Sequence, residues 1–282
     1  MPFRVKVGAA EIVGLVDRVH RIDPAWHYES VPAISWEPYR DILEDEVTGL
    51  LNFRAFLVRA DGRQILIDAG WGPDFAPPGA PSTPASLLDE LAAVDAGVDD
   101  IDLVLFTHLH ADHVGWNLIT DADGVRPRFR NARYLVPAAD WAYETSGKFM
   151  HPNFRQNALP LGDLGVLDQF EDGEIDICPS LRTVPSPGHS PGHTCFLLHD
   201  GNAELMVLGD LAHHTVVVTE DDWVNRFDWD PEKAVAMRRE ILARLERDRT
   251  LAAGSHFSAP GFGWVERVDG RRRWRPMPTD AG

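Results

Sequence analysis

The feature that most constrains this chain is a cluster of three histidines and one aspartate within six residues, directly after an apolar segment. The apolar segment, residues 101–106, predicts a short buried strand. His108 and His110 alternate as on an extended chain, so they project to one side, whereas Asp112 and His113 follow where a helical turn would swing them back. Imidazole is the commonest side-chain ligand of zinc and similar ions. The segment therefore predicts a site that can serve two neighbouring metal ions.

Other polar residues follow apolar segments in the same way. Asp68, Asp210 and His256 each come at the end of a short apolar run. A glycine- and proline-rich turn over residues 187–193 presents His189 and His193. Because a rigid scaffold presents its chemistry at the ends of strands, we expect these groups to meet at one rim of the fold.

Short strands separated by proline and glycine dominate the rest of the chain. The predicted hairpins, each with an Asp-Gly turn, are residues 53–68 and 263–274. The predicted helices are residues 86–94, 138–143 and 231–246. We expect Thr83 to cap the first of them, and we expect residues 147–165 to form a loop or lid. Strands, a helix, further strands and a late helix predict two sheets packed face to face with helices outside, which is an α/β class.

Composition excludes several classes of protein. The chain has 282 residues and a formal net charge of −17, which disfavours a nucleic-acid or anionic-membrane partner. The basic run Arg271–Arg273 is interpreted as a solvated hairpin face. No apolar run approaches the roughly 20 residues of a membrane span, and the N-terminus lacks the plan of a signal peptide. Cys178 and Cys195 are too few for a disulfide framework and are expected in the core, so we expect a cytoplasmic location.

The motifs H-x-H-x-D-H at 108–113, G-H at 189, G-D at 210 and the late His256 resemble the metallo-β-lactamase superfamily of metallo-hydrolases over about residues 50–260. The resemblance implies an αββα sandwich of two mixed β-sheets flanked by helices. It implies one such domain over residues 1–282, with residues 1–47 as an N-terminal extension or lid. It also implies two divalent metal ions, of which Zn²⁺ is the expected identity. The implied ligands are His108, His110 and His189 for the first ion, Asp112, His113 and His256 for the second, and Asp210 as the bridge.

Two bridged ions lower the pKa of the water between them and polarise the substrate oxygen, so Asp112 and Asp210 are candidate catalytic residues. In the N-acyl-homoserine lactonases, a tyrosine three residues after the bridging aspartate assists the substrate. His213 stands at that position here, and histidine can polarise a substrate or protonate a leaving group. Whether His193 and His214 act at the site stays open. The remaining histidines, predicted to be surface or structural, are His20, His27, His151 and His199.

The C-terminal segment, residues 254–263, is similar to that of the branch containing methyl parathion hydrolase and lactonase-like enzymes. Tryptophans expected to border the site favour an uncharged, apolar substrate. These tryptophans are Trp26, Trp36, Trp71 and Trp116. We therefore expect a metal-dependent hydrolase that opens a lactone or carboxylic ester by attack of a metal-bridging hydroxide. The alternatives are an organophosphate triester or thioester hydrolase of the same fold, an iron-dependent redox member, and a non-enzymatic binding module. The resemblance also suggests a homodimer.

Overall fold

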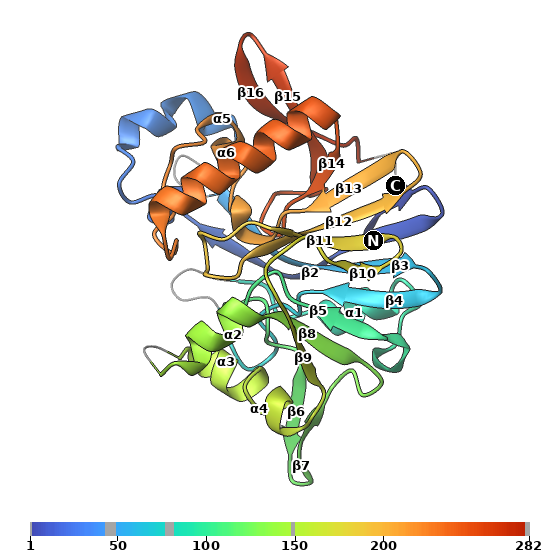
Figure 1. Cartoon of the computed structure of the whole chain (residues 1–282). Coiled ribbons are helices and arrows are strands. Elements are labelled where there is room, and N and C mark those ends of the chain that lie inside the picture. Colours follow the sequence, from blue (N-terminus) through green and yellow to red (C-terminus); the bar gives the residue numbers. More distant parts are fainter. Residues whose placement is uncertain (1, 43–48, 77–81, 148–149, 280–282) are drawn as a thin grey trace.

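The structure is a computed structural model that describes residues 2–42, 49–76, 82–147 and 150–279. It contains two seven-stranded sheets packed face to face (Figure 1). The first sheet consists, in spatial order, of β1 (Phe3–Val7), β2 (Ala10–Ile22), β3 (Gly49–Ala60), β4 (Arg63–Ile67), β5 (Leu103–Leu105), β8 (Arg133–Pro137) and β9 (Leu167–Phe170). The second consists of β10 (Asp176–Cys178), β11 (Leu181–Pro185), β12 (Thr194–Asp200), β13 (Ala203–Val207), β14 (Leu251–Ala253), β15 (Phe262–Val268) and β16 (Arg271–Pro276). A separate hairpin consists of β6 (Leu118–Asp121) and β7 (Gly124–Pro127).

Both large sheets are mixed. In the first, β1 to β4 are antiparallel neighbours and β4, β5, β8 and β9 are parallel neighbours. In the second, only the β13–β14 pair is parallel. The parallel pairs direct the ends of β4 and β5 to one rim, and the ends of β13 and β14 likewise leave together. This arrangement gathers the polar residues that follow these strands.

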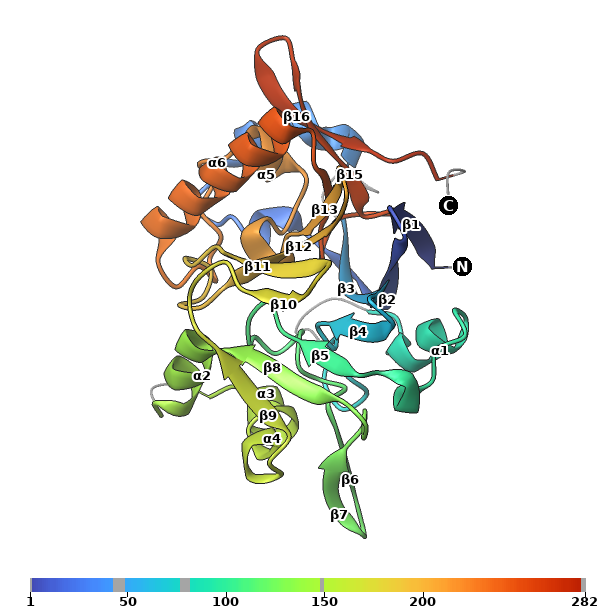
Figure 2. The ribbon, with the colours of Figure 1, turned by 45° about the vertical axis from the view of Figure 1, so that its right-hand side comes forward.

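Helices cover the outer face of each sheet (Figures 1 and 2). The α-helices are α1 (Leu87–Ala92), α2 (Ala138–Thr145), α3 (Pro152–Asn157), α4 (Pro160–Asp163), α5 (Val216–Thr219) and α6 (Pro231–Asp248). The 3-10 helices are η1 (Pro24–Trp26), η2 (Ala33–Ile42), η3 (Val98–Asp100) and η4 (Gly209–Leu211). Buried side chains from α1, α3 and α4 share one cluster with the first sheet, and those from α5 and α6 share another with the second. The αββα sandwich expected from the sequence is confirmed.

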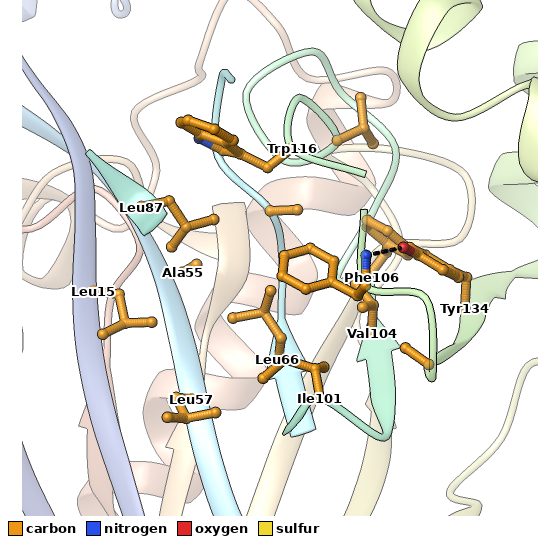
Figure 3. Packing of buried hydrophobic residues seen from close by; sticks show 14 of the residues in the cluster. Leu15, Ala55, Leu57, Leu66, Leu87, Ile101, Val104, Phe106, Trp116 and Tyr134 are labelled. Carbon is orange, nitrogen blue, oxygen red and sulfur yellow. Dashed lines mark hydrogen bonds between the residues drawn. The ribbon is translucent and has the colours of Figure 1, made fainter. Parts of the chain in front are cut away.

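Apolar side chains cover both faces of the strands, because successive residues of a strand point to opposite sides of the sheet. Ile65 and Ile67 of β4 pack between the two sheets, whereas Leu66 joins the cluster under the helices. Figure 3 shows this outer cluster, in which Val104 of β5 stands between Leu66 of β4 and Tyr134 of β8. Such continuous apolar runs are typical of strands covered on both faces.

Two helical segments differ from what the sequence predicts. Helix α1 is capped at Ser86, not Thr83, because the distant carboxylate of Asp17 accepts hydrogen bonds from the backbone N–H groups of Ser86 and Leu87. Thr83 instead pairs with Val19 of β2. The prediction of a loop or lid over residues 147–165 is wrong for α3 and α4, each of which begins at a proline.

Other predictions are confirmed. The hairpin β3–β4 turns at Asp61 and Gly62, both with positive φ. Helix α6 begins with Pro231 after Asp230, whose side chain accepts a hydrogen bond from Lys233 N. Both cysteines are buried and free. No helix in the part of the chain that the structure describes is long and apolar enough to cross a membrane.

Candidate metal centre

The polar residues predicted to meet do so at one rim of the sandwich. The segment after β5 carries His108, His110, Asp112 and His113, and the turn between β11 and β12 carries His189. Asp210 lies in η4, directly after β13, and His256 follows β14. Gly209 has a φ of +53°, and a Cβ there would come within 2.8 Å of both His193 Nε2 and Thr107 Cβ. Only glycine therefore lets the chain turn Asp210 into the site at this point.

The seven side chains form two groups that share Asp210. One group is His108, His110, His189 and Asp210, and the other is Asp112, His113, Asp210 and His256. Within each group, one potential ligand atom from every residue lies within 4.8 Å of the others. This division is the one that the sequence resemblance implies.

Asp210 faces both groups with different oxygens. Its Oδ2 lies 3.5 Å from His108 Nε2 and 3.3 Å from His189 Nε2. Its Oδ1 lies 3.3 Å from His113 Nε2 and 2.9 Å from His256 Nε2. A carboxylate placed in this way can be shared by two cations without moving.

Four of the atoms that face the middle of the site lack hydrogen-bond partners. His108 Nε2, His113 Nε2, His256 Nε2 and Asp210 Oδ1 are all buried, and none makes a hydrogen bond of acceptable geometry within the described chain. Unpaired buried polar atoms are costly, and so many of them converging on one place need a ligand that binds them together. Nitrogen and carboxylate oxygen are the donors that zinc and related ions take. The two groups therefore fit two divalent metal ions.

Hydrogen bonds on the far side of two imidazoles, those of His189 and His256, fix the rings. His189 Nδ1 lies 3.0 Å from Asp228 Oδ1, and His256 Nδ1 lies 2.8 Å from the carbonyl oxygen of Asn52. A proton held on Nδ1 leaves the Nε2 lone pair directed into the site. Asp228 and Asn52 are functional residues that the sequence reasoning missed.

Asp68 supports the segment after β5. Its Oδ2 lies 2.8 Å from His113 Nδ1, and it accepts hydrogen bonds at 2.9 Å from the backbone and hydroxyl of Thr107. Asp68 has a φ of 62°, a conformation that costs free energy for a residue other than glycine. The surrounding contacts hold this conformation, so the carboxylate supports the site from behind and does not enter either group.

The electrostatic field of the site favours positive charge. Burial alone would lower the pKa of His113, but the carboxylates around it, Asp210 foremost, hold that pKa well above its ordinary value. Burial would raise the pKa of Asp210, yet the neighbouring imidazoles, His256 foremost, hold it well below its ordinary value. Asp210 is thus an anion among donors that can bind cations.

The site opens into a cavity of about 490 Å³. Apolar and aromatic side chains form most of its wall, including Trp26, Phe53, Trp71, Phe227 and Trp229. Trp36 and Trp116, which the sequence analysis expected here, pack into the cores of the two layers instead. No lysine or arginine is among the described residues that line the cavity.

Several other histidines lie at or near the site. His213 lines the cavity with Nε2 at 3.0 Å from Asp210 Oδ2, and its ring stacks on that of His256 at 5.0 Å. Burial lowers the pKa of His213. His193 lies behind the site, where its Nε2 accepts a hydrogen bond from Asp210 N. His214 instead accepts a hydrogen bond from Val216 N and faces Trp36.

Three of the histidines predicted to be surface or structural border the cavity. These are His20, His27 and His151. His27 lies within 5.7 Å of the His213 ring, and burial lowers its pKa to about 2. Trp26 and His27, at the end of and directly after η1, reach the cavity, and no local motif in the sequence signals that contact.

Comparison with known proteins agrees with this geometry. Residues 53–255 match the family model described as the metallo-beta-lactamase superfamily, which is most of the chain. The chain belongs to the metallo-beta-lactamase superfamily. Members of this superfamily share the fold but not one reaction, so the match itself does not set the substrate.

Similar curated proteins are N-acyl homoserine lactonases. The chain is 29% identical over 143 residues to AttM from Agrobacterium fabrum, covering 48% of this chain and 49% of AttM. It is 30% identical over 176 residues to AttM from Rhizobium johnstonii, covering 58% and 59% of the two chains. The matches thus span about half the length of these relatives.

Solved structures share the fold over nearly the whole length. AidC, a dizinc quorum-quenching lactonase, matches with a TM-score of 0.82 and 21% identity over 98% of this chain and 97% of AidC. The hydrolase AbOPH of the beta lactamase superfamily matches with a TM-score of 0.83 and 23% identity over the same shares. At this identity the likeness supports the fold.

Proposed function

We propose that this protein is a metal-dependent hydrolase that opens a lactone, with carboxylic esters as a second substrate class. The observation that carries the proposal is the pair of His/Asp groups sharing Asp210 at the floor of an apolar cavity. The similarity to N-acyl homoserine lactonases supports a lactone as the substrate. The aromatic wall without lysine or arginine supports an uncharged acyl or alkyl portion.

In this proposal the first ion is held by His108, His110 and His189, the second by Asp112, His113 and His256, and Asp210 holds both. Zn²⁺ is the proposed identity because imidazole and carboxylate donors suit it. Two such ions, when bound, supply a water of lowered pKa and a Lewis acid for the substrate carbonyl.

The residues around the metal groups position the substrate, exclude bulk water and supply a proton to the leaving oxygen. Asp112 Oδ2 lies 3.3 Å from His113 Nε2 and 3.5 Å from His256 Nε2, so its carboxylate stands among the donors proposed for the second ion. His213 borders the cavity beside Asp210, where its imidazole N–H can bind a substrate oxygen or be given to the oxygen that leaves the ring. The walls over the site exclude bulk water and strengthen these interactions.

We also propose that residues 1–282 form one domain. The two sheets share a single apolar cluster between them, and the site takes residues from both. Part of the N-terminal segment that the sequence suggested as an extension or lid contributes to the site, because Trp26 and His27 line the cavity. Strands β1 and β2 of that segment belong to the first sheet.

A substrate panel tests the proposed reaction. The metal-loaded protein is assayed with N-acyl homoserine lactones of several chain lengths, aryl esters, phosphotriesters and glutathione thioesters. We expect lactones to give the highest kcat/KM, esters to follow, and phosphotriesters and thioesters to be poor. A clear preference for phosphotriesters or thioesters would overturn the lactone assignment, and an iron-dependent oxidation would overturn hydrolysis altogether.

A variant of His213 tests its role separately from metal binding. We expect His213→Phe to lower kcat for lactone opening by about 10²-fold, a typical contribution of a positioned proton donor, while the metal content stays at the wild-type level. His214→Phe is the matched control, since His214 is an adjacent buried imidazole that faces Trp36. Metal content and kcat for lactone opening are measured for both variants. Loss of metal from His213→Phe would contradict the proton-donor role and indicate a ligand.

A further inference from the structure

His193 lies behind the first metal group without being one of its ligands. It is fully buried, and its ring centroid lies 5.3 Å from that of His108 and 5.9 Å from that of His189. It belongs to neither metal group, and it is not among the described residues that line the cavity. Any part that His193 plays in the site is therefore exerted through the residues that it contacts.

The imidazole of His193 holds the backbone of Asp210. Its Nε2 accepts a hydrogen bond of 2.9 Å from Asp210 N. Asp210 lies in η4, a helix of three residues, and the first N–H groups of a helix have no partner within it. The bond therefore gives a buried N–H its acceptor and fixes the peptide plane between Gly209 and Asp210. The direction of the Asp210 carboxylate depends on that plane.

The hydrogen bonds of His193 also determine which ring nitrogen carries a proton. Nε2 accepts from a backbone N–H, so it has no proton, and the proton of the neutral ring lies on Nδ1. Nδ1 lies 2.8 Å from Ser186 Oγ and donates to it. The same oxygen accepts a hydrogen bond of 3.2 Å from Cys195 N, and Cys195 Sγ lies 3.3 Å from it. Each polar atom of the two side chains thus has a partner, which holds the ring in one tautomer.

Ser186 and His193 close the turn that carries His189. Ser186 N donates a hydrogen bond of 2.8 Å to the carbonyl oxygen of His193. The same histidine contacts the segment of Asp210, where a Cβ on Gly209 would come within 2.8 Å of His193 Nε2. The turn of His189 and the segment of Asp210 are therefore held in one fixed relation.

We propose that His193, kept in its Nδ1-protonated tautomer by Ser186, is a positioning residue for the bridging carboxylate of Asp210. The inference rests on the proposed function, because it concerns the same two metal groups. It adds that the backbone of Asp210 is set before any ion binds, so that Oδ1 and Oδ2 already face their groups. Losing this support costs metal affinity even though every ligand is still present.

The tautomer is tested by nitrogen-15 NMR of the zinc-loaded protein labelled at its histidines. Signals that are missing from the spectrum of His193→Gln belong to His193. We expect a proton on Nδ1 and none on Nε2. A proton on Nε2, or on both ring nitrogens, would overturn the proposal, because Nε2 could not then accept the hydrogen bond from Asp210 N.

Zinc affinity tests the positioning role. His193→Leu leaves the N–H of Asp210 buried without an acceptor, so we expect the affinity for the more weakly bound Zn²⁺ to fall by about 10- to 100-fold. His193→Gln brings an amide oxygen near the place of Nε2 and should recover most of this loss. Ser186→Ala removes only the partner of Nδ1 and should lie between wild type and His193→Leu. Competition with a coloured chelator measures all of these affinities.

A matched control and a replacement variant keep the test decisive. His199→Leu removes a histidine of the same strand, β12, that belongs to neither metal group, and it should bind Zn²⁺ as wild type does. Wild-type affinity in His193→Leu, or the same loss in His193→Gln or His199→Leu, would overturn the proposal. If His193→Leu fails to fold, Ser186→Ala takes its place, and wild-type affinity there would overturn the proposal.

Neither measurement uses a substrate. If the predicted tautomer and affinities are found but no lactone is opened, the positioning role stands and the proposed function fails.

Discussion

Replacing Asp210 with asparagine is expected to reduce the metal content below one ion per chain and to lower kcat/KM for lactones by about 10³-fold. Asp210 faces both groups, with Oδ2 toward His108 and His189 and Oδ1 toward the second group. An amide has one weak acceptor oxygen and no charge, so it cannot hold two cations. Its NH₂ group would also point hydrogens at one set of imidazole lone pairs.

Elemental analysis and lactone kinetics on purified Asp210→Asn measure both effects. Asp222→Asn is the matched control, because Asp222 is exposed and lies outside both groups. Circular dichroism checks that the variant folds. Two retained ions together with wild-type turnover would show that Asp210 does not bridge the groups.

Replacing Asp17 with alanine is expected to lower the free energy of unfolding by about 3–5 kcal/mol, because several buried donors would lose their acceptor. Asp17 is fully buried. Its Oδ2 accepts hydrogen bonds from the backbone of Trp71 at 2.9 Å and Gly72 at 3.3 Å, and its Oδ1 accepts from Trp116 Nε1 at 2.8 Å. The same Oδ1 also accepts from the backbone at the start of α1.

Urea unfolding measures this loss, and the substrate KM provides a second measurement. Because Trp71 forms part of the cavity wall, we expect KM for lactones to rise together with the loss of stability. Asp17→Asn, which keeps the shape and one acceptor, should lie between wild type and Asp17→Ala. Asp172→Ala, at an exposed position, is the control. A loss below about 1 kcal/mol in Asp17→Ala would contradict this account of the buried network.

Much of the metal centre could be predicted because its residues follow strand ends. Asp68, His108, Asp210 and His256 each come after a short apolar run, and parallel pairing brings neighbouring strand ends to one rim. Both the apolar run and the polar residue after it can be recognised in the sequence. Only the packing of one sheet on the other had to come from the structure.

The supporting residues could not be predicted in this way. Asp228 holds His189 from 39 positions away in a segment without periodicity, and Asn52 holds His256 through its backbone carbonyl, which any residue could provide. The Asp17 carboxylate accepts hydrogen bonds at the start of α1 from about 70 residues away in the sequence. Residues near the helix cannot reveal that contact, and among them Thr83 is the favoured cap. The prolines that begin α3 and α4 were a usable signal, because proline is favoured in the first helical turn.

Metal removal and titration test the central claim most directly. The protein is stripped with a chelator, and lactone turnover is followed as Zn²⁺, Mn²⁺ or Co²⁺ is added. The account predicts no turnover in the stripped protein and full recovery when about two ions per chain are bound. Undiminished lactone turnover with less than about a tenth of an ion per chain would contradict it.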